Sequence, residues 1–128
     1  MKKTKISANT IWESTVGYSR AIRIDDFIVV AGTAPVDNDE IVATGNAYEQ
    51  AKFIITKIEN TLKELNASLN DIIRTRIFVK DISKWEEIGK AHGEFFNEIK
   101  PVTTMIEVKA FIHPDILVEI EAEAIVNH

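Results

Sequence analysis

The sequence predicts one α/β (α+β) domain over residues 1–128, in which a mixed sheet carries two helices on one face, in the order ββαβαββ. The chain length is ordinary for a single domain with one core. Two segments have apolar residues at spacings of three and four, and the segments around them alternate with the period of two typical of strands. Strands joined by a helix run parallel with right-handed crossovers, which places both helices on the same face.

The N-terminal part of the sequence is expected to form an irregular arm followed by a β-hairpin. Residues 1–16 lack clear periodicity, and we expect an ordered but irregular arm. Trp12 in this arm either covers the core, which we favour because large aromatic residues are mostly buried, or forms part of a pocket wall. Residues 18–24 and 27–31 are β-rich, and the two residues between them suit a hairpin turn. Gly32 then marks a place where the chain turns or another group approaches the backbone closely.

The first helix is predicted between residues 47 and 65 because one apolar stripe runs along its length. The stripe consists of Ala47, Ala51, Ile54, Ile58, Leu62 and Leu65. Asn46, with Glu49 three residues later, resembles a capping arrangement at the start of the helix. Asn66 is a suitable stop at its end.

A strand and a second helix follow. The strand is predicted at residues 72–80, with Ile73, Thr75, Ile77 and Val79 toward the core and Arg74, Arg76, Phe78 and Lys80 on the other face. A capping box formed by Ser83 and Glu86 predicts the start of the helix, and Pro101 ends it. Its buried stripe should comprise Trp85, Ile88, Ala91, Phe95 and Ile99.

Residues 100–126 predict two strands joined by a turn at residues 113–115, which we interpret as a hairpin. In the last strand, apolar residues from Val118 to Ala124 alternate with Glu119, Glu121 and Glu123. In the strand before it, we expect Ile106 to face the core and Met105 to face the other side. The hairpin therefore has one apolar face to bury and one polar face.

The face of the sheet that the helices leave uncovered has two interpretations. It is expected to carry charged residues from neighbouring strands together with Phe78, Met105 and Phe111. It is either a solvated face with cross-strand ion pairs or a face buried against further copies of the chain. The pattern alone leaves both interpretations open.

Composition excludes several classes of function. The net charge of −5 disfavours a nucleic-acid partner, which requires a basic surface. The chain has no cysteine and therefore no thiol nucleophile, and its three histidines are too far apart in sequence to suggest a metal site. No apolar run is long enough to cross a membrane, and the N-terminus lacks the pattern of a signal peptide. We expect no metal or other cofactor, no nucleic-acid or membrane partner, and a cytoplasmic location.

Three landmarks carry a resemblance to a known family. They are GY at residues 17–18 followed by IVVAGTAP at 28–35, then RIFVKDI at 76–82, and finally PVTTMIEV at 101–108 with VEIEA at 118–122. In this order and spacing, from about residue 17 to residue 126, the chain resembles the Rid family, the reactive-intermediate deaminases also called YjgF or L-PSP proteins. The resemblance implies a chorismate-mutase-like fold and a homotrimer, with the uncovered sheet faces packed together and three sites in clefts between subunits.

The resemblance also implies a reaction and a set of site residues. The best-known members hydrolyse 2-imino acids and their enamine tautomers to 2-keto acids and ammonia. Their glutamate, which is associated with the attacking water, corresponds to Glu119, and a tyrosine of the same cleft corresponds to Tyr18. The arginine that binds the substrate carboxylate corresponds to Thr103. A serine before Gly32 and a cysteine near the arginine are replaced by Ala31 and Met105, respectively.

The change at Thr103 argues against direct transfer of the standard reaction, because a hydroxyl supplies neither the charge nor the planar fork of a guanidinium. Arg20 lies two residues after Tyr18, so both side chains should point to the same face of the strand. Arg20 could therefore supply the missing cation, and residues 12–13 and 17–21 resemble Rid subgroups that lack the usual arginine. Alternatively, Arg20 pairs with Glu119 or Glu121.

Three hypotheses follow. The first is a homotrimer whose clefts bind, and in one version hydrolyse, a small imine, enamine or keto acid. In it Tyr18, Arg20, Thr103 and Glu119 line the site together with Ala31, Gly32 and Met105. The second is a 2-iminobutanoate/2-iminopropanoate deaminase that uses Arg20 in place of the absent arginine. The third is a non-catalytic regulatory or protein-interaction module, to which a trimer would give multivalency.

Overall fold

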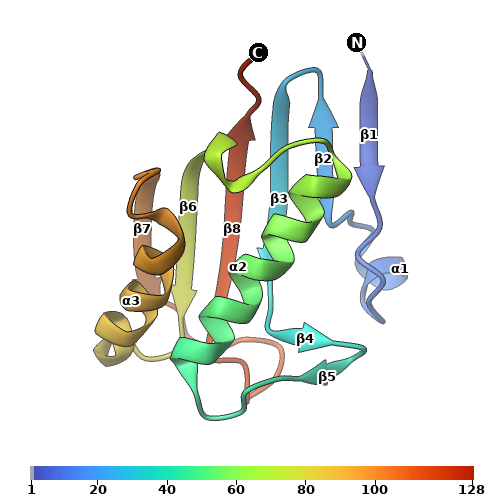
Figure 1. Ribbon diagram of the computed structural model, residues 1–128. Coiled ribbons are helices and arrows are strands. Elements are labelled where there is room, and N and C mark those ends of the chain that lie inside the picture. Colours follow the sequence, from blue (N-terminus) through green and yellow to red (C-terminus); the bar gives the residue numbers. More distant parts are fainter. Residues whose placement is uncertain (1) are drawn as a thin grey trace.

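The computed structural model, which describes residues 2–128, has a mixed sheet with two long helices on one face, as predicted (Figure 1). Its strands are β1 (Lys3–Ile6), β2 (Ala21–Ile24), β3 (Phe27–Thr33), β4 (Val36–Asp37), β5 (Glu40–Ile41), β6 (Ile72–Val79), β7 (Val102–Glu107) and β8 (Val118–Ile125). Its helices are α1 (Glu13–Val16), α2 (Ala47–Glu64) and α3 (Trp85–Phe96), with short 3₁₀ turns η1 (Leu69–Asp71) and η2 (Ile82–Lys84). The main sheet has the order β1-β2-β3-β8-β6-β7, and β4 and β5 pair separately.

The two helical crossovers join parallel strands, as predicted. Strands β6 and β7 are parallel neighbours connected through α3. Strands β3 and β6, connected through α2, also run in the same direction, because each is antiparallel to β8 between them. The predicted hairpin of the last two strands is wrong for this reason: β8 inserts between β3 and β6, so that β7 pairs with β6 alone. Residues 108–117 therefore form a long connection instead of a tight turn.

Three local predictions are confirmed, namely the turn between β2 and β3 and the signals at the two ends of α2. Strands β2 and β3 are joined by a two-residue loop in which Ile24 pairs with Phe27 and Asp25 has a φ of 52°. At the start of α2, the Asn46 side chain accepts a hydrogen bond from the Glu49 backbone N–H at 3.0 Å. Asn66, just after this helix, has a φ of 58°, which ends the helical path.

The core lies between α2, α3 and the sheet. Ile54, Ile55, Ile58 and Leu62 of α2 belong to the same buried cluster as residues of β3, β6 and β8. Burying each such side chain stabilises the fold by about 1.5–3 kcal/mol. Gln50 is also fully buried, and its amide holds the loops at one end of the sheet. It donates to the carbonyls of Val42 and Asp115 and accepts from the Leu117 N–H at 2.9 Å.

Three predictions about α3 and its neighbours are wrong for local reasons. The N–H of Ser83 is bonded by the Asp81 carboxylate at 2.9 Å, so residues 82–84 form η2 and the capping box does not open α3. Trp85 at the first position of α3 is 56% exposed, whereas Phe96 at its end is buried. In β6, an irregularity in the pairing between Ile72 and Arg74 leaves Ile72 buried and Ile73 exposed, whereas Thr75, Ile77 and Val79 are buried as predicted.

Strand β7 also has the opposite orientation to the one predicted. Met105 pairs with buried Ile77 and packs against the core, whereas Ile106 pairs with Phe78 and is 47% exposed. Successive strand residues point to opposite faces of the sheet, so a shift of one residue exchanges all residues that face the core with all those that face away from it. Met105 therefore belongs to the helix-covered face and not to the uncovered one.

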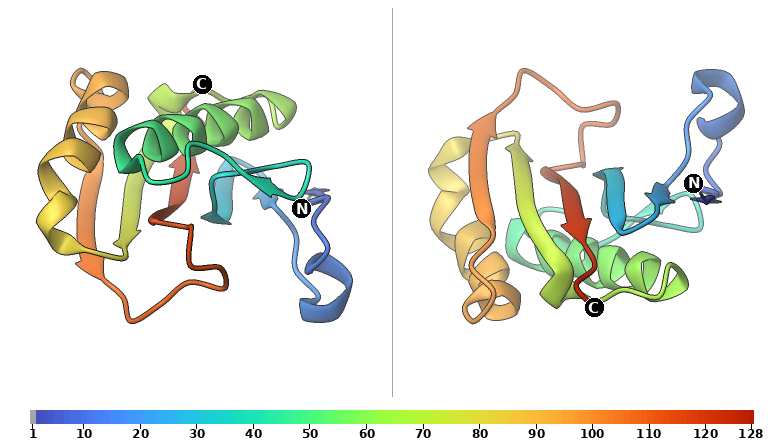
Figure 2. Two further views of the ribbon diagram at one scale, coloured as in Figure 1. Left: turned by 90° about the horizontal axis from the view of Figure 1, so that it is seen from below. Right: turned by 90° about the horizontal axis from the view of Figure 1, so that it is seen from above.

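The N-terminal arm is more regular than predicted. Its first residues form β1, which pairs with β2 at the edge of the sheet. The chain then turns back, and the Glu13 carboxylate holds this turn by accepting hydrogen bonds from Ser7 Oγ and the Asn9 N–H. Gly17 ends α1 with a φ of 79°, a conformation that glycine adopts readily. In Figure 2 the segment around α1 and residues 108–117 both project from the sheet face opposite α2 and α3.

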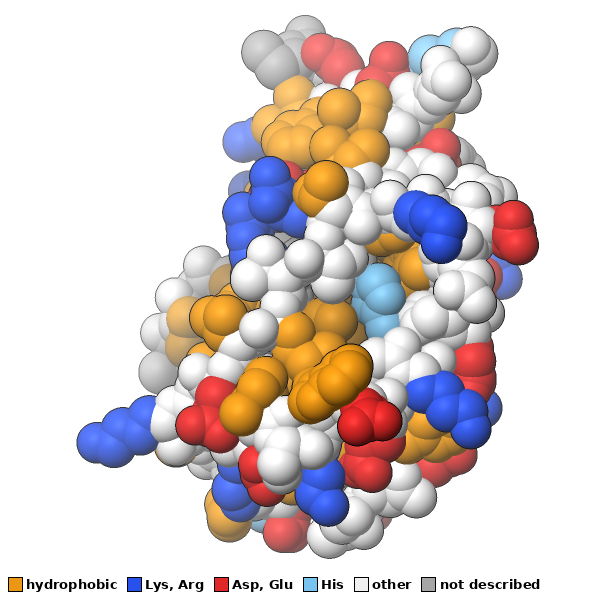
Figure 3. Space-filling model, turned by 90° about the vertical axis from the view of Figure 1, so that its left-hand side faces the viewer, with side chains coloured by type: hydrophobic (Ala, Val, Ile, Leu, Met, Phe, Trp, Pro, Cys, Tyr) orange, Lys and Arg blue, Asp and Glu red, His pale blue; other side chains and the backbone are white. Residues whose placement is uncertain are grey.

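The uncovered face combines ion pairs with exposed apolar residues. Arg76 pairs with Glu121 at 3.0 Å and with Glu123 at 3.3 Å, and Arg74 pairs with Glu123, which confirms the predicted cross-strand ion pairs. The same face presents the exposed apolar side chains of Phe27, Val29, Val102, Ile106 and Ile125. Hydrophobic side chains also gather on the side formed by α3 and β7 (Figure 3). Among residues 2–128, no helix has the length and apolarity that crossing a membrane requires.

Candidate functional site

A cleft of about 330 Å³ lies where β3 ends and β8 begins, and residues of the N-terminal arm and of the long connection before β8 also line it. It is lined by Thr10, Trp12, Tyr18, Arg20, Ala31, Gly32, Ala34, Val36, Lys57, Ile112 and Glu119. We call it the Glu119 cleft. It contains five of the seven predicted site residues, namely Tyr18, Arg20, Ala31, Gly32 and Glu119.

The pairing of β3 with β8 brings Ala31, Gly32 and Glu119 together. The register shifts between Val30 and Thr33, so Ala31 and Gly32 form an irregularity beside the start of β8. Such irregularities are common next to active sites, where they redirect the backbone. A Cβ atom on Gly32 would lie 3.2 Å from Glu119 Oε1. The close approach predicted at Gly32 is confirmed, and the group that approaches is the Glu119 carboxylate.

Arg20 is a buried cation that forms no ion pair within residues 2–128. Only 5% of it is exposed, and its Nη1 donates to Thr33 Oγ1 at 3.1 Å. The predicted pairing with Glu119 or Glu121 is wrong, because Glu121 pairs with Arg76 and Glu119 does not reach ion-pairing distance. Burial lowers the pKa of Arg20, and this effect is opposed by nearby groups that include Tyr18 and Glu119. An arginine in this setting is suited to bind an anion from solution.

Glu119 is a carboxylate that projects into the cleft without a hydrogen-bond partner in the described chain. Burial raises the pKa of Glu119, and the charge of Arg20 acts in the opposite direction. A carboxyl group with a raised pKa is a better base and can exchange a proton with a bound water nearer to neutral pH. The pair of Arg20 and Glu119 can therefore hold an anionic ligand and activate a water beside it.

The arm supplies an aromatic wall. Tyr18 Oη and Thr10 Oγ1 share a hydrogen bond of 2.6 Å, which ties the cleft to the turn that Glu13 holds. Trp12 lines the same cleft and does not belong to the core cluster. The preferred interpretation of Trp12 as a cover of the core is therefore wrong, and the pocket-wall alternative is correct.

Thr103 and Met105 do not line this cleft. Both face the helix-covered side, where Thr103 pairs with buried Thr75. Thr103 Oγ1 donates to the Pro101 carbonyl at 3.2 Å and shares a 2.8 Å hydrogen bond with Thr75 Oγ1. Thr75 in turn contacts His92 Nε2 at 2.9 Å, and burial lowers the pKa of His92 to about 4. The hydroxyl proton of Thr103 is thus already used within its own chain.

Sequence reasoning missed five residues that line the cleft, which are Thr10, Ala34, Val36, Lys57 and Ile112. Lys57 comes three residues after Ile54 on the edge of the apolar stripe of α2, and a lysine at such a position is a usable signal of a half-buried cation. Ile112 is in the long connection before β8, whose path depends on tertiary contacts. In the described part of the chain, no three His, Asp or Glu side chains are grouped to hold a metal ion.

Comparisons with known proteins agree with this architecture. The family model described as Endoribonuclease L-PSP matches residues 9–126. The crystal structure of Rv2704 from Mycobacterium tuberculosis, a member of the YjgF/YER057c/UK114 family, is 45% identical, with a TM-score of 0.88 over 98% of this chain and 100% of that one. A RutC family protein of Pyrococcus abyssi is 38% identical over 84% of each chain. The 3-aminoacrylate deaminase RutC of Acinetobacter baylyi is 30% identical over 84% of this chain and 85% of its own.

The matched region covers every strand from β2 to β8, both long helices and every residue of the Glu119 cleft. The chain therefore belongs to the Rid family of YjgF/L-PSP proteins.

Proposed function

We propose that the Glu119 cleft binds a small 2-imino acid or its enamine tautomer and hydrolyses it to the 2-keto acid and ammonia. The observation that carries this proposal is Arg20, a buried guanidinium without a carboxylate partner in the described chain, in the same cleft as the unpartnered Glu119 carboxylate. This arrangement favours the hypothesis in which Arg20 replaces the arginine that is absent at Thr103.

In the proposed reaction, Arg20 fixes the substrate carboxylate and thereby directs the imine carbon toward Glu119. Glu119 accepts a proton from a water while the water oxygen bonds to that carbon and the C=N electron pair moves to nitrogen. The tetrahedral intermediate then forms the keto C=O bond and breaks the C–N bond. Glu119 returns its first proton to the nitrogen, then accepts the hydroxyl proton of the intermediate and passes it to the same nitrogen as it departs, so imine and water give keto acid and ammonia.

The relatives support the reaction class. The Acinetobacter baylyi relative is a deaminase of 3-aminoacrylate, which is an enamine that carries a carboxylate. Such a substrate requires a cation for its carboxylate and a base for the attacking water, and the Glu119 cleft contains both.

We also propose that the chain acts as a cytoplasmic homotrimer with its sites between subunits. The exposed apolar residues of the uncovered face support burial of that face against other copies. Sedimentation analysis is expected to give a mass near three times that of one chain, and a monomeric mass would contradict the assembly.

The reaction can be tested by generating 2-aminoacrylate with a serine dehydratase and following its decay. The protein is expected to accelerate the decay, and Glu119→Gln should abolish the acceleration without changing the assembly. Glu98→Gln serves as the control, because Glu98 is exposed and does not line the Glu119 cleft. Failure of the correctly assembled wild type to accelerate the decay would contradict the proposed function and favour binding without turnover.

A further inference from the structure

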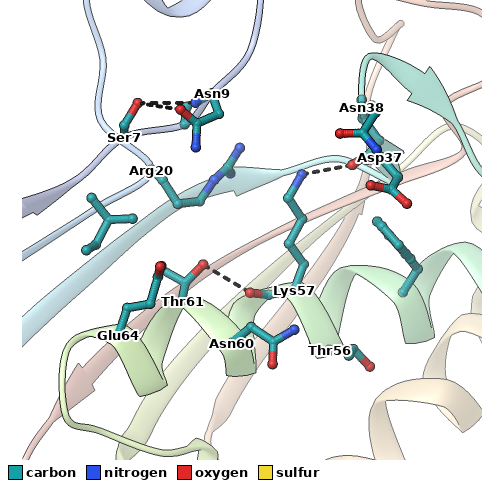
Figure 4. A pocket seen from close by; sticks show the side chains of 14 residues that line it. Ser7, Asn9, Arg20, Asp37, Asn38, Thr56, Lys57, Asn60, Thr61 and Glu64 are labelled. Carbon is teal, nitrogen blue, oxygen red and sulfur yellow. Dashed lines mark hydrogen bonds between the residues drawn. The ribbon is translucent and has the colours of Figure 1, made fainter.

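A second cavity of about 510 Å³ adjoins the Glu119 cleft (Figure 4). It lies between the N-terminal strands, the loop around β4 and helix α2. The two cavities share Arg20, Val36 and Lys57 as lining residues. The side chains of Arg20 and Lys57 thus stand at the boundary between the two spaces.

Lys57 is a second cation without an ion-pair partner in residues 2–128. Its Nζ donates a hydrogen bond to the Val36 carbonyl at 2.9 Å, which leaves two of its three N–H groups for other acceptors. Burial lowers the pKa of Lys57 and the charge of Arg20 lowers it further, while the charge of Asp37 acts in the opposite direction. Figure 4 shows the charged ends of Lys57 and Arg20 directed into the same part of the cavity from opposite sides.

Two like charges that are partly removed from water repel each other unless an anion lies between them. The carboxylates that line the second cavity, Asp37 and Glu64, form no ion pair with either cation. A monocarboxylate held by Arg20 in the Glu119 cleft would leave Lys57 without an anion at ion-pairing distance, because the charge of Asp37 acts on Lys57 only from further away. A ligand with a second anionic group would satisfy both cations.

We infer that the ligand of this protein is dianionic: a 2-imino or 2-keto acid with a second carboxylate at the far end of its chain. Arg20 binds the carboxylate next to the reacting carbon, and Lys57 binds the distal carboxylate at the boundary with the second cavity. This inference rests on the proposed function and adds a substrate class to it. Selectivity arises because the half-buried Lys57 attracts a charged chain end more strongly than an apolar one.

The test compares dicarboxylates and monocarboxylates of equal chain length by titration calorimetry. The probes are the pairs 2-oxoglutarate with 2-oxopentanoate and 2-oxoadipate with 2-oxohexanoate. Of the two dicarboxylates, the one that binds more tightly is expected to bind the wild type at least about tenfold more tightly than the monocarboxylate of the same length, since it forms one more charge-assisted hydrogen bond. In Lys57→Met this ratio should fall to about one.

Control variants keep the test decisive. Lys57→Arg retains the charge and is expected to keep most of the preference. Lys63→Met removes an exposed lysine of the same helix that lines neither cavity, and it should leave the ratio unchanged. Two outcomes would overturn the dianionic ligand and leave the proposed function standing. One is equal affinity of the wild type for both members of every pair, and the other is an unchanged ratio of affinities in Lys57→Met. Absence of binding for all four acids would overturn the proposed function itself.

Discussion

Replacement of Arg20 by methionine tests whether this arginine binds a ligand or stabilises the fold. An arginine that stabilises the fold through a buried ion pair leaves an uncompensated charge when it is removed, at a cost of about 3–5 kcal/mol. Arg20 has no such partner in residues 2–128, and its guanidinium bonds the neutral hydroxyl of Thr33. That hydrogen bond contributes about 1 kcal/mol, and removal of a desolvated charge offsets part of this loss. The free energy of unfolding of Arg20→Met should therefore lie within about 1 kcal/mol of wild type.

The effect on binding should be much larger. A carboxylate held by the fork of Arg20 forms two charge-assisted hydrogen bonds, each contributing about 1.5–3 kcal/mol. The loss of both amounts to about 3 kcal/mol or more, which corresponds to at least about a hundredfold increase in Kd. Calorimetric titration with a 2-keto acid measures this affinity, and urea unfolding measures the stability.

Arg23 provides the matched control, because it is a structural arginine on β2. It donates to the carbonyls of Leu65, after the end of α2, and of Asp25 in the adjacent turn. Arg23→Met should lower the free energy of unfolding by about 1–3 kcal/mol and leave the Kd unchanged. The reasoning is refuted if Arg20→Met behaves like this control, with lost stability and retained affinity.

Three further predictions concern the cleft and its support. The pKa of Glu119 is higher in the folded protein than in the unfolded chain, so the contribution of Glu119 to the free energy of unfolding falls as the pH rises toward and through the folded-state pKa. Glu119→Gln removes this loss and should be at least as stable as wild type at pH 8. This advantage should vanish below the unfolded-state pKa of about 4.3, as thermal unfolding across pH can show. Gly32→Ala places a Cβ 3.2 Å from Glu119 Oε1 and should slow turnover while changing the unfolding free energy by about 1 kcal/mol or less. An unchanged kcat would show that the carboxylate position is not critical. Gln50→Leu leaves three backbone groups without their partner and should cost about 2–4 kcal/mol in urea unfolding, whereas a loss below about 1 kcal/mol would count against its role as an anchor.

Periodicity predicted the helices and the sheet because burial of one face leaves a direct mark on the sequence. The stripe of α2 and its Asn46 cap are examples, since each depends on residues a few positions apart. The position of β8 between β3 and β6 leaves no such mark, because strand order depends on contacts between distant segments. The reversed faces of β7 have a similar cause. Both Met105 and Ile106 are apolar, so the alternation there allows either register.

The cleft was predictable to the extent that its residues match family positions. Tyr18, Ala31 and Glu119 were found in this way, Gly32 was found from its place at the end of a strand, and Arg20 was found from its spacing to Tyr18. The sequence did not predict that Arg20 forms no ion pair within residues 2–128, because this depends on the position of every nearby carboxylate. Lys57 was missed because the helical pattern indicates a half-buried position but not that this position lies beside β4 and Arg20, which depends on tertiary contacts.

The central claim is that Arg20 has taken over the role of the carboxylate-binding arginine. A crystal structure of the protein soaked with 2-oxoglutarate tests it most directly. We expect one carboxylate within hydrogen-bonding distance of the Arg20 guanidinium and the keto carbon facing the Glu119 carboxylate. A ligand bound with its carboxylate at Thr103, with no contact to Arg20, would contradict the claim.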